Sequence, residues 1–340
     1  MNYDELESVA RTLVREGKGI LAADESFGTI EKRFKSIKLE STEETRRSYR
    51  ELLFTTAGIE EFISGVILFD ETIHQKAQNG IPFSDVLAHK GILPGIKVDK
   101  GATDLAGFPG EKITEGLDGL RARLVEYRSL GARFAKWRAV ITIGDHIPTH
   151  FCIEANSHAL ARYAAICQEV GLVPIVEPEV LMDGDHDIER CKEVTTTTLK
   201  SVFFNLHAHR VVLEAMLLKP NMVLPGRECP KQASVAVVAE TTVRSLRSAV
   251  PAAVPGIVFL SGGQSPELAT EHLNAMNNLG RQPWELSFSY ARALQEPTLK
   301  VWKGEATNVP AAQDIFYHRA KCNGAARFGT YSKGMEISQA

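Results

Sequence analysis

The feature that most constrains the fold of this chain is a regular alternation of short apolar runs with longer amphipathic stretches. Eight runs with strand character occur at 19–23, 65–69, 95–98, 134–141, 172–176, 215–218, 257–260 and 286–290. The segments between them show helical periodicity, as at Leu117, Leu120, Leu124 and Tyr127. Strands that alternate with helices indicate a parallel sheet of βα units.

Eight strand–helix units of similar length predict one α/β domain, a (β/α)₈ TIM barrel over residues 1–340. No linker rich in Gly, Pro or Ser divides the chain into halves. We expect an extra N-terminal helix over residues 4–16, because Leu6, Val9, Leu13 and Val14 share one face, and a short C-terminal tail from about residue 332. A doubly wound open sheet is the alternative. The barrel is favoured because polar residues follow nearly every strand, where barrel enzymes build their sites.

Local signals predict where some helices begin. Residues 41–44 (STEE) match a capping box with Ser41 as the N-cap, and Ser265 before Pro266 places proline at a first helical position. Residues 183–187 (DGDHD) resemble the start of a calcium loop. The later glycine and glutamate of that loop are missing, so we interpret the segment as a turn and helix cap.

Composition excludes several classes of partner. Hydrophobic residues make up 44% of the chain and charged residues 24%, and the net charge of −3 provides no broad basic field for nucleic acid or acidic membranes. Five widely spaced cysteines without a Cys-x-x-Cys pair indicate reduced thiols. The acidic N-terminus lacks the features of a signal or transit peptide. We therefore expect a cytoplasmic protein without membrane contact.

Three lysines in apolar surroundings point to chemistry. Lys219 ends an apolar run directly before Pro220, and Lys97 and Lys136 lie in predicted strands. Burial disfavours the ammonium form of lysine, which leaves more free amine to add to a carbonyl and form a Schiff base. A lysine that merely reaches water from a strand end is the other interpretation. The neighbouring lysines favour the interpretation of Lys219 as a nucleophile, because a second ammonium nearby increases the fraction of lysine that is present as the free amine.

Charged residues lie in or soon after the predicted strands in a repeating pattern: Asp24, Glu25, Asp70, Glu71, Lys97, Asp99, Lys136, Arg138, Glu177, Glu179, Lys219 and Arg292. In a barrel these strand ends meet, so we expect one ring of charge in which the groups perturb one another. Strand alternation sends Lys136 and Arg138 to the same side. Glu177 is the candidate proton shuttle for making and dehydrating a carbinolamine.

Two segments are typical of anion sites. Residues 259–266 (FLSGGQSP) read as strand, glycine loop and helix start, which would present the backbone N–H groups around Ser261, Gly262 and Gly263 to a phosphate. Ser26 and Thr29, with Arg33 behind them, suggest a second anion site. The alternatives without a bound anion are a βα turn for the first segment and a helix cap for the second. No histidine occurs in a His-Glu-x-x-His arrangement, so no metal site is predicted.

Six motifs together resemble class I fructose-bisphosphate aldolase. They are 19–26 (GILAADES), 95–101 (GIKVDKG), 134–138 (FAKWR), 174–179 (PIVEPE), 217–222 (LLKPNM) and 259–265 (FLSGGQS). The resemblance implies reversible cleavage of fructose 1,6-bisphosphate to dihydroxyacetone phosphate and glyceraldehyde 3-phosphate in glycolysis and gluconeogenesis. It also implies no metal, no cofactor, sugar phosphates as the small-molecule partners, and a homotetramer.

The resemblance assigns roles by position. Lys219 matches the Schiff-base lysine, Glu177 and Lys136 handle protons during carbinolamine formation and dehydration, Asp24 accepts the C4 hydroxyl proton, and Glu179 is a supporting carboxylate. The positions that bind phosphate or line the site are Ser26, Thr29, Arg33, Lys97, Arg138, Ser261, Gly262, Gly263, Ala291 and Arg292.

Three departures from the family pattern bear on function. Ala291 stands where glycine is frequent, which is tolerable unless that position needs positive φ. Phe27 adds bulk between Ser26 and Gly28, so crowding of the phosphate at C6 is expected. The last tyrosine is Tyr331, and we expect the segment from residue 332 to be a solvated end.

Two rival functions remain at the level of sequence. Another Schiff-base barrel enzyme of the transaldolase type is disfavoured, because two phosphate sites suit a bisphosphate. A barrel that acts mainly as a protein-binding scaffold is disfavoured because every matched catalytic position keeps a competent side chain.

Overall fold

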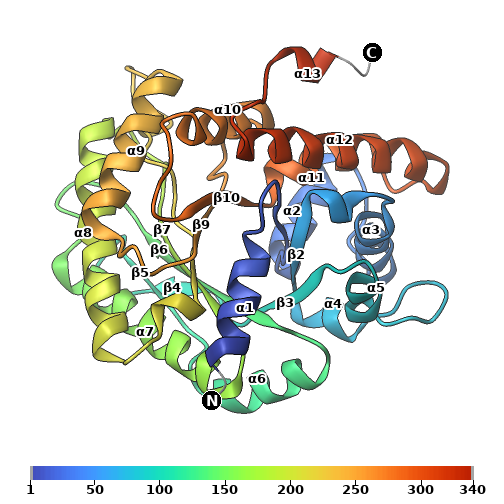
Figure 1. The fold of residues 1–340 in the computed structure, drawn as a ribbon, viewed down its shortest axis with the longest axis horizontal. Coiled ribbons are helices and arrows are strands. Elements are labelled where there is room, and N and C mark those ends of the chain that lie inside the picture. Colours follow the sequence, from blue (N-terminus) through green and yellow to red (C-terminus); the bar gives the residue numbers. More distant parts are fainter. Residues whose placement is uncertain (1–2, 338–340) are drawn as a thin grey trace.

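The computed structural model describes residues 3–337, and its centre is a closed barrel of parallel strands (Figure 1). The barrel strands are β1 (Gly19–Ala23), β2 (Ile63–Leu68), β3 (Leu93–Lys97), β6 (Phe134–Ile141), β7 (Val173–Val180), β8 (Leu217–Leu218), β9 (Gly256–Phe259) and β10 (Glu285–Tyr290). Their order around the barrel, β1-β10-β9-β8-β7-β6-β3-β2, follows the chain. The predicted (β/α)₈ barrel is confirmed.

Helices surround the barrel (Figure 1). They are α1 (Tyr3–Leu13), α2 (Phe27–Ser36), α3 (Glu43–Thr55), α4 (Asp70–His74), α5 (Phe83–His89), α6 (Leu120–Ser129), α7 (His150–Val170), α8 (Ile188–Ala208), α9 (Val235–Ala249), α10 (Pro266–Asn277), α11 (Arg292–Trp302), α12 (Val309–Arg327) and α13 (Gly334–Ile337). Short 3₁₀ turns lie at Ile59–Glu61, Leu213–Ala215 and Ala306–Asn308. Strands β4 (Ala102–Asp104) and β5 (Lys112–Thr114) form a separate antiparallel pair between β3 and β6.

The interior of the barrel is apolar at one end. Phe134, Ile175 and Leu217 point inward and form one cluster with Leu6 and Leu13 of α1. The other face of the same strands packs against the outer helices in a second, larger cluster. Figure 1 shows α1 across the middle of the molecule, where it covers this apolar end. Burial of its Leu/Val face therefore closes the barrel on the side where the strands begin.

Most predicted helix starts agree with the structure. Ser265 caps α10 with Pro266 in its first turn, and Asp187 caps α8, as the turn interpretation of 183–187 requires. The capping box at α3 is displaced by one residue. Thr42 is the N-cap, and its hydroxyl and backbone pair with Thr45. The prediction of Ser41 was wrong because Thr45 returns the hydrogen bond that the Ser/Glu pattern assigns to Glu44.

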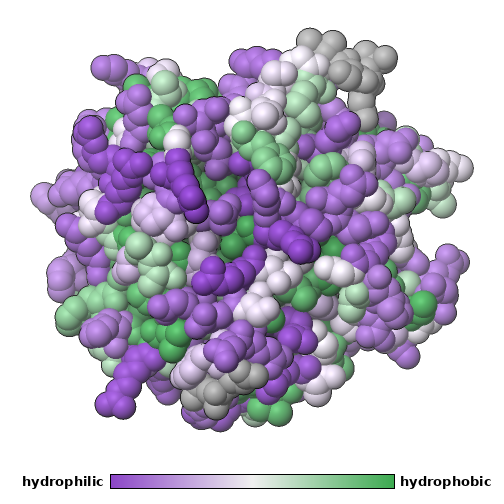
Figure 2. All heavy atoms as spheres, in the orientation of Figure 1, coloured by the Kyte–Doolittle hydropathy of each residue, from purple (hydrophilic) through white to green (hydrophobic). Residues whose placement is uncertain are grey.

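The predicted N-terminal helix is shorter than expected. Helix α1 ends at Leu13, although Val14 is buried with it. On the face drawn in Figure 2, hydrophobic residues lie in small patches among hydrophilic ones. Across residues 3–337, no helix combines the length and the apolar character needed to cross a bilayer.

Candidate active site

A cavity of about 1120 Å³ opens at the ends of the barrel strands opposite α1. It is lined by nearly all of the site residues predicted from sequence: Asp24, Ser26, Thr29, Arg33, Lys97, Lys136, Arg138, Glu177, Glu179, Lys219, Ser261, Gly262, Ala291 and Arg292. Gly263 is not part of this lining; it lies beside the Arg292 guanidinium. The structure thus gathers residues from almost every barrel strand into one place.

Strand periodicity explains why charged side chains enter the barrel. Along β6, Phe134 contributes to the apolar interior, and Lys136 lies two residues further on. Alternate residues of a strand point to the same side, so Lys136 faces the axis above Phe134. Glu177 follows Ile175 on β7 in the same way. Lys219 follows Leu217 directly after β8.

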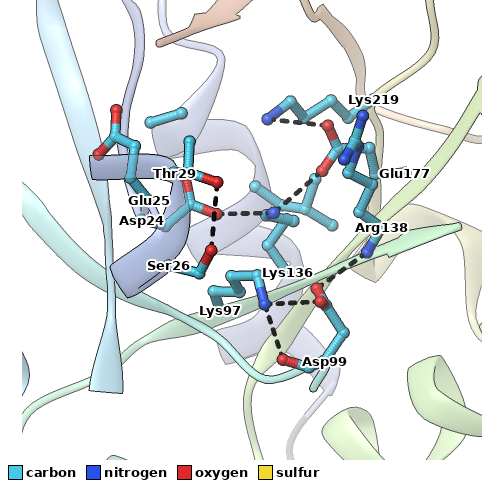
Figure 3. Close-up of polar contacts among 12 residues, drawn as sticks. Asp24, Glu25, Ser26, Thr29, Lys97, Asp99, Lys136, Arg138, Glu177 and Lys219 are labelled. Carbon is cyan, nitrogen blue, oxygen red and sulfur yellow. Dashed lines mark hydrogen bonds and ion pairs between the residues drawn. The ribbon is translucent and has the colours of Figure 1, made fainter. Parts of the chain in front are cut away.

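Four charged groups form a continuous chain at the bottom of the cavity (Figure 3). The Lys219 Nζ lies 3.2 Å from Oε1 of Glu177, and the Lys136 Nζ lies 3.2 Å from Oε2 of the same carboxylate. On its other side the Lys136 Nζ is 2.6 Å from Oδ2 of Asp24. The residues are 3–8% exposed, so these interactions are screened little by water.

Neighbouring charges shift the pKa values of Asp24 and Lys136. Burial alone would raise the pKa of Asp24, but the ammonium groups of Lys136 and Lys219 outweigh it and hold that pKa well below its usual range. Burial would lower the pKa of Lys136, but the carboxylates of Asp24 and Glu177 raise it above its ordinary value. Lys136 is therefore held as an ammonium by two carboxylates, whereas Lys219 contacts Glu177, which it shares with Lys136.

A second tier of ion pairs lies nearer the cavity mouth. Arg138 Nε donates to Oε2 of Glu179. Lys97 Nζ lies 2.6 Å from Oδ1 of Asp99 (Figure 3). Asp99 also accepts a hydrogen bond from the backbone N–H of Arg138, at 3.2 Å. These contacts orient Arg138 and Lys97 toward the cavity that both line.

Cationic and backbone groups gather at the loop after β9. Gly262 and Gly263 have φ of +58° and +88°, a left-handed backbone that a side chain would strain. A methyl group on Gly263 would collide with Nη2 of Arg227 and come within 2.9 Å of Nη2 of Arg292. Ala291, the N-cap of α11, has φ of −101°, so alanine replaces glycine there without strain. Two guanidinium groups and a helix N-terminus thus face one point, which suits an anion.

The second predicted anion site lies at the start of α2. Ser26 is the N-cap, and its hydroxyl is 3.1 Å from that of Thr29. Arg33 Nη1 donates to Oε1 of Glu25, whose other oxygen is 2.6 Å from the Arg50 Nη2. Burial would raise the pKa of Glu25, but these two guanidinium groups lower it, so Glu25 holds Arg33 in position as a carboxylate.

The expected crowding by Phe27 was wrong. Its ring packs edge-on against Phe69 with centroids 5.2 Å apart, and the Arg46 guanidinium lies 4.8 Å from its centroid. Phe27 is exposed and does not line the catalytic cavity, and its bulk borders a different, smaller pocket.

Comparison with known proteins identifies the family. Residues 5–340 match the sequence profile described as "Fructose-bisphosphate aldolase class-I". The chain belongs to the class-I fructose-bisphosphate aldolase family. This confirms the resemblance and makes the protein a lyase of that family.

Similar proteins span nearly the whole chain. The probable class 1 fructose-bisphosphate aldolase of Xanthomonas campestris is 61% identical over 97% of this chain and 99% of its own length. The cytosolic fructose-bisphosphate aldolase 5 of Arabidopsis thaliana is 57% identical over 97% of this chain and 92% of its own. The fructose-bisphosphate aldolase of Plasmodium falciparum, solved in complex with TRAP and a small-molecule inhibitor, superimposes with a TM-score of 0.96. It is 52% identical and covers 98% of this chain and 96% of its own.

Two features of the site in this aldolase-family chain were not predicted from the sequence. Arg227 was not singled out, although it follows β8 in residues 217–227 (LLKPNMVLPGR) and so lies in a loop at the carboxyl end of a barrel strand. Its place in such a loop is the sequence signal that could have identified it as a site residue. The buried Glu25–Arg50 pair had no signal, because Arg50 is on α3, far from any strand end.

The C-terminal segment of this aldolase-family chain is more ordered than predicted. Residues 334–337 form α13, and Glu336 accepts a hydrogen bond of 2.8 Å from the hydroxyl of Tyr331 and another from Nη1 of Arg319. The expectation of a solvated end from residue 332 agrees with the exposed residues 332–334 but was wrong for Met335 and Glu336, because Arg319 is a buried cation that pairs with the Glu336 carboxylate. Residues 338–340 lie outside the described part of the chain.

Proposed function

We propose that this chain catalyses the metal-independent, reversible cleavage of fructose 1,6-bisphosphate through a Schiff base on Lys219. The observation that carries the proposal is the pairing of a buried amine with a buried carboxylate, Lys219 with Glu177, on the floor of a cavity that has cationic groups at two ends. Such a pair can transfer protons while the amine acts as nucleophile.

The first steps need a free amine and a proton carrier. Lys219 Nζ gives a proton to Glu177 and attacks the C2 ketone of the open-chain sugar, which forms a carbinolamine. Glu177 then returns the proton to the leaving hydroxyl, so that water departs and an iminium remains. Lys136 stays an ammonium next to Glu177 and Asp24, and it stabilises both carboxylates through the sequence.

Cleavage of the C3–C4 bond follows from the position of Asp24. As a carboxylate beside Lys136, Asp24 accepts the C4 hydroxyl proton while the electron pair of the C3–C4 bond moves into the iminium. Glyceraldehyde 3-phosphate leaves, and the enamine is protonated at C3 and hydrolysed to dihydroxyacetone phosphate. We assign this C3 protonation to Glu177 or to an oxygen of the substrate phosphate. Glu179 supports the site by orienting Arg138.

The two phosphates would bind at opposite ends of the cavity. The C1 phosphate fits the loop after β9, with the groups that converge there: Ser261, Gly262, Gly263, Ala291, Arg292 and the additional cation Arg227. The C6 phosphate fits the second cationic end, where Ser26, Thr29, Arg33 and Lys97 line the cavity. Arg138 lies between the four charged groups at the bottom of the cavity and the cavity mouth.

Trapping of the Schiff base tests the assignment. We expect borohydride reduction in the presence of dihydroxyacetone phosphate to attach the three-carbon unit to Lys219, identified by peptide mapping. Attachment at Lys136 or Lys97 would overturn it. The same preparation should keep full cleavage activity in EDTA, because the iminium supplies the electrophile. Activity that EDTA abolishes and zinc restores would contradict the metal-independent mechanism.

We further propose that the protein acts in the cytoplasm, in glycolysis and gluconeogenesis, as a homotetramer. The names of the Arabidopsis relatives, which are cytosolic aldolases, support the location. The assembly rests on family resemblance alone. Sedimentation equilibrium of the purified chain should give four times the monomer mass of 37.4 kDa, and a monomer mass at micromolar concentration would refute the tetramer.

A further inference from the structure

Three potential metal ligands meet on the outside of the barrel, where α13 contacts α12. His318 and Cys322 are one turn apart on α12, so their side chains share a face. The Nε2 of His318 lies 3.5 Å from Sγ of Cys322 and 3.4 Å from Oε2 of Glu336, which comes from α13. The three ligand atoms all lie within 4.8 Å of one another.

The spacing fits a tetrahedral ion. Zinc bonds of roughly 2.3 Å to sulfur and about 2.0–2.2 Å to nitrogen and oxygen place neighbouring ligand atoms of a tetrahedron about 3.3–3.6 Å apart. The two distances from His318 Nε2, 3.5 Å to Cys322 Sγ and 3.4 Å to Glu336 Oε2, match that edge, and the third pair, Cys322 and Glu336, has its ligand atoms within 4.8 Å of each other. One sulfur, one imidazole nitrogen and one carboxylate oxygen also form a borderline-soft set, which suits zinc better than magnesium or calcium.

The surroundings already orient the carboxylate. Oε1 of Glu336 accepts hydrogen bonds from the Tyr331 hydroxyl and the Arg319 guanidinium, which leaves Oε2 directed at His318. Such outer hydrogen bonds hold metal ligands in the correct rotamer. The contacts with Arg319 and Tyr331 account for Oε1 of Glu336 but not for the convergence of His318 and Cys322 near its other oxygen.

We propose that His318, Cys322 and Glu336 form a zinc site with one open coordination position, which ties α13 to α12. The three residues do not line the catalytic cavity, so this ion takes no part in the aldol chemistry. Its role is to hold the segment after Tyr331 against the barrel. Cys322 is buried, whereas His318 and Glu336 are partly exposed and provide the entry for the ion.

Cobalt substitution tests the site in the full-length protein. Cobalt(II) added to EDTA-treated, desalted protein should bind with one equivalent per chain. It should give the near-ultraviolet band of a thiolate–cobalt bond together with the visible bands of a tetrahedral ion. Zinc should displace the cobalt and raise the midpoint of thermal unfolding.

Matched variants assign the ligands. Cys322→Ser should lose the thiolate band, and His318→Gln should weaken cobalt binding at least tenfold, while Cys229→Ser, a buried cysteine elsewhere, should behave as wild type. Cleavage activity of each variant reports whether it is folded, because the catalytic cavity is separate. If wild-type protein gives no thiolate band, or if Cys322→Ser keeps it, the proposal is overturned. If Cys322→Ser does not fold, retention of the band in folded His318→Gln at wild-type affinity also overturns it.

Discussion

Replacement of Glu177 by glutamine is the most direct perturbation of the proposed mechanism. Each oxygen of this carboxylate lies 3.2 Å from a lysine nitrogen, one from Lys219 and one from Lys136. At an effective dielectric constant near 20, each contact is worth about 5 kcal/mol before desolvation is subtracted. The amide removes both attractions, so that Lys136 keeps only Asp24 as a carboxylate in direct contact and Lys219 loses its carboxylate partner.

We expect Glu177→Gln to lose about 3–5 kcal/mol of stability, the usual cost of breaking a buried ion pair on one side. Cleavage should fall by about 10²–10⁴-fold, because an amide cannot carry the proton between the amine and the leaving hydroxyl. Formation of the borohydride-trapped adduct with dihydroxyacetone phosphate should slow in parallel, since the same proton transfers build the iminium.

Glu179→Gln is the matched control. Glu179 lies two residues further along β7 and is also buried, but its partner Arg138 is 41% exposed at the side chain, so solvent screens that pair. Its stability loss should stay within about 1 kcal/mol. Urea unfolding, steady-state cleavage and single-turnover trapping measure the three quantities. If Glu177→Gln traps substrate as fast as wild type, Glu177 is not the proton carrier; if its stability is unchanged, the electrostatic reasoning fails.

Four further outcomes are expected. Asp24→Asn should abolish cleavage but still trap substrate on Lys219, and failure to trap would place Asp24 in iminium formation or in folding. Arg227→Ala should raise the KM for fructose 1,6-bisphosphate about tenfold with little change in kcat, because one charge-assisted phosphate contact of roughly 1.5 kcal/mol is lost; an unchanged KM removes Arg227 from the site. Burial lowers the pKa of His272 to about 4, so between about pH 4 and pH 6.5 the unfolded chain binds a proton that the folded chain does not. Stability should fall by about 2 kcal/mol from pH 7 to pH 5, and a fall of the same size in His272→Gln would refute this cause. Truncation after Tyr331 should leave cleavage and tritium exchange near wild type but lower stability by about 3 kcal/mol, because buried Arg319 loses Glu336. A selective collapse of exchange would instead give the tail a catalytic role.

The sequence by itself determined the barrel and the members of its charged ring. Strand runs are short and bounded, so their number and order could be predicted, and β1 and β6 begin and end where the sequence indicated. Alternation along each strand then decides which side chains face the axis, as with Lys136 two residues after Phe134. Both results depend on the spacing of residues along the chain, and this spacing can be taken from the sequence before the fold is known.

Only the tertiary structure decided which groups touch. That Glu177 lies between Lys219 and Lys136 depends on how three strands are staggered around the closed barrel, and no spacing along the chain contains that stagger. The approach of Arg227 to Gly263 has the same origin, since the two lie on loops after different strands. Ion pairs and metal ligands act over a few ångströms between residues distant in sequence, so their partners are determined only when the barrel closes and the outer helices pack.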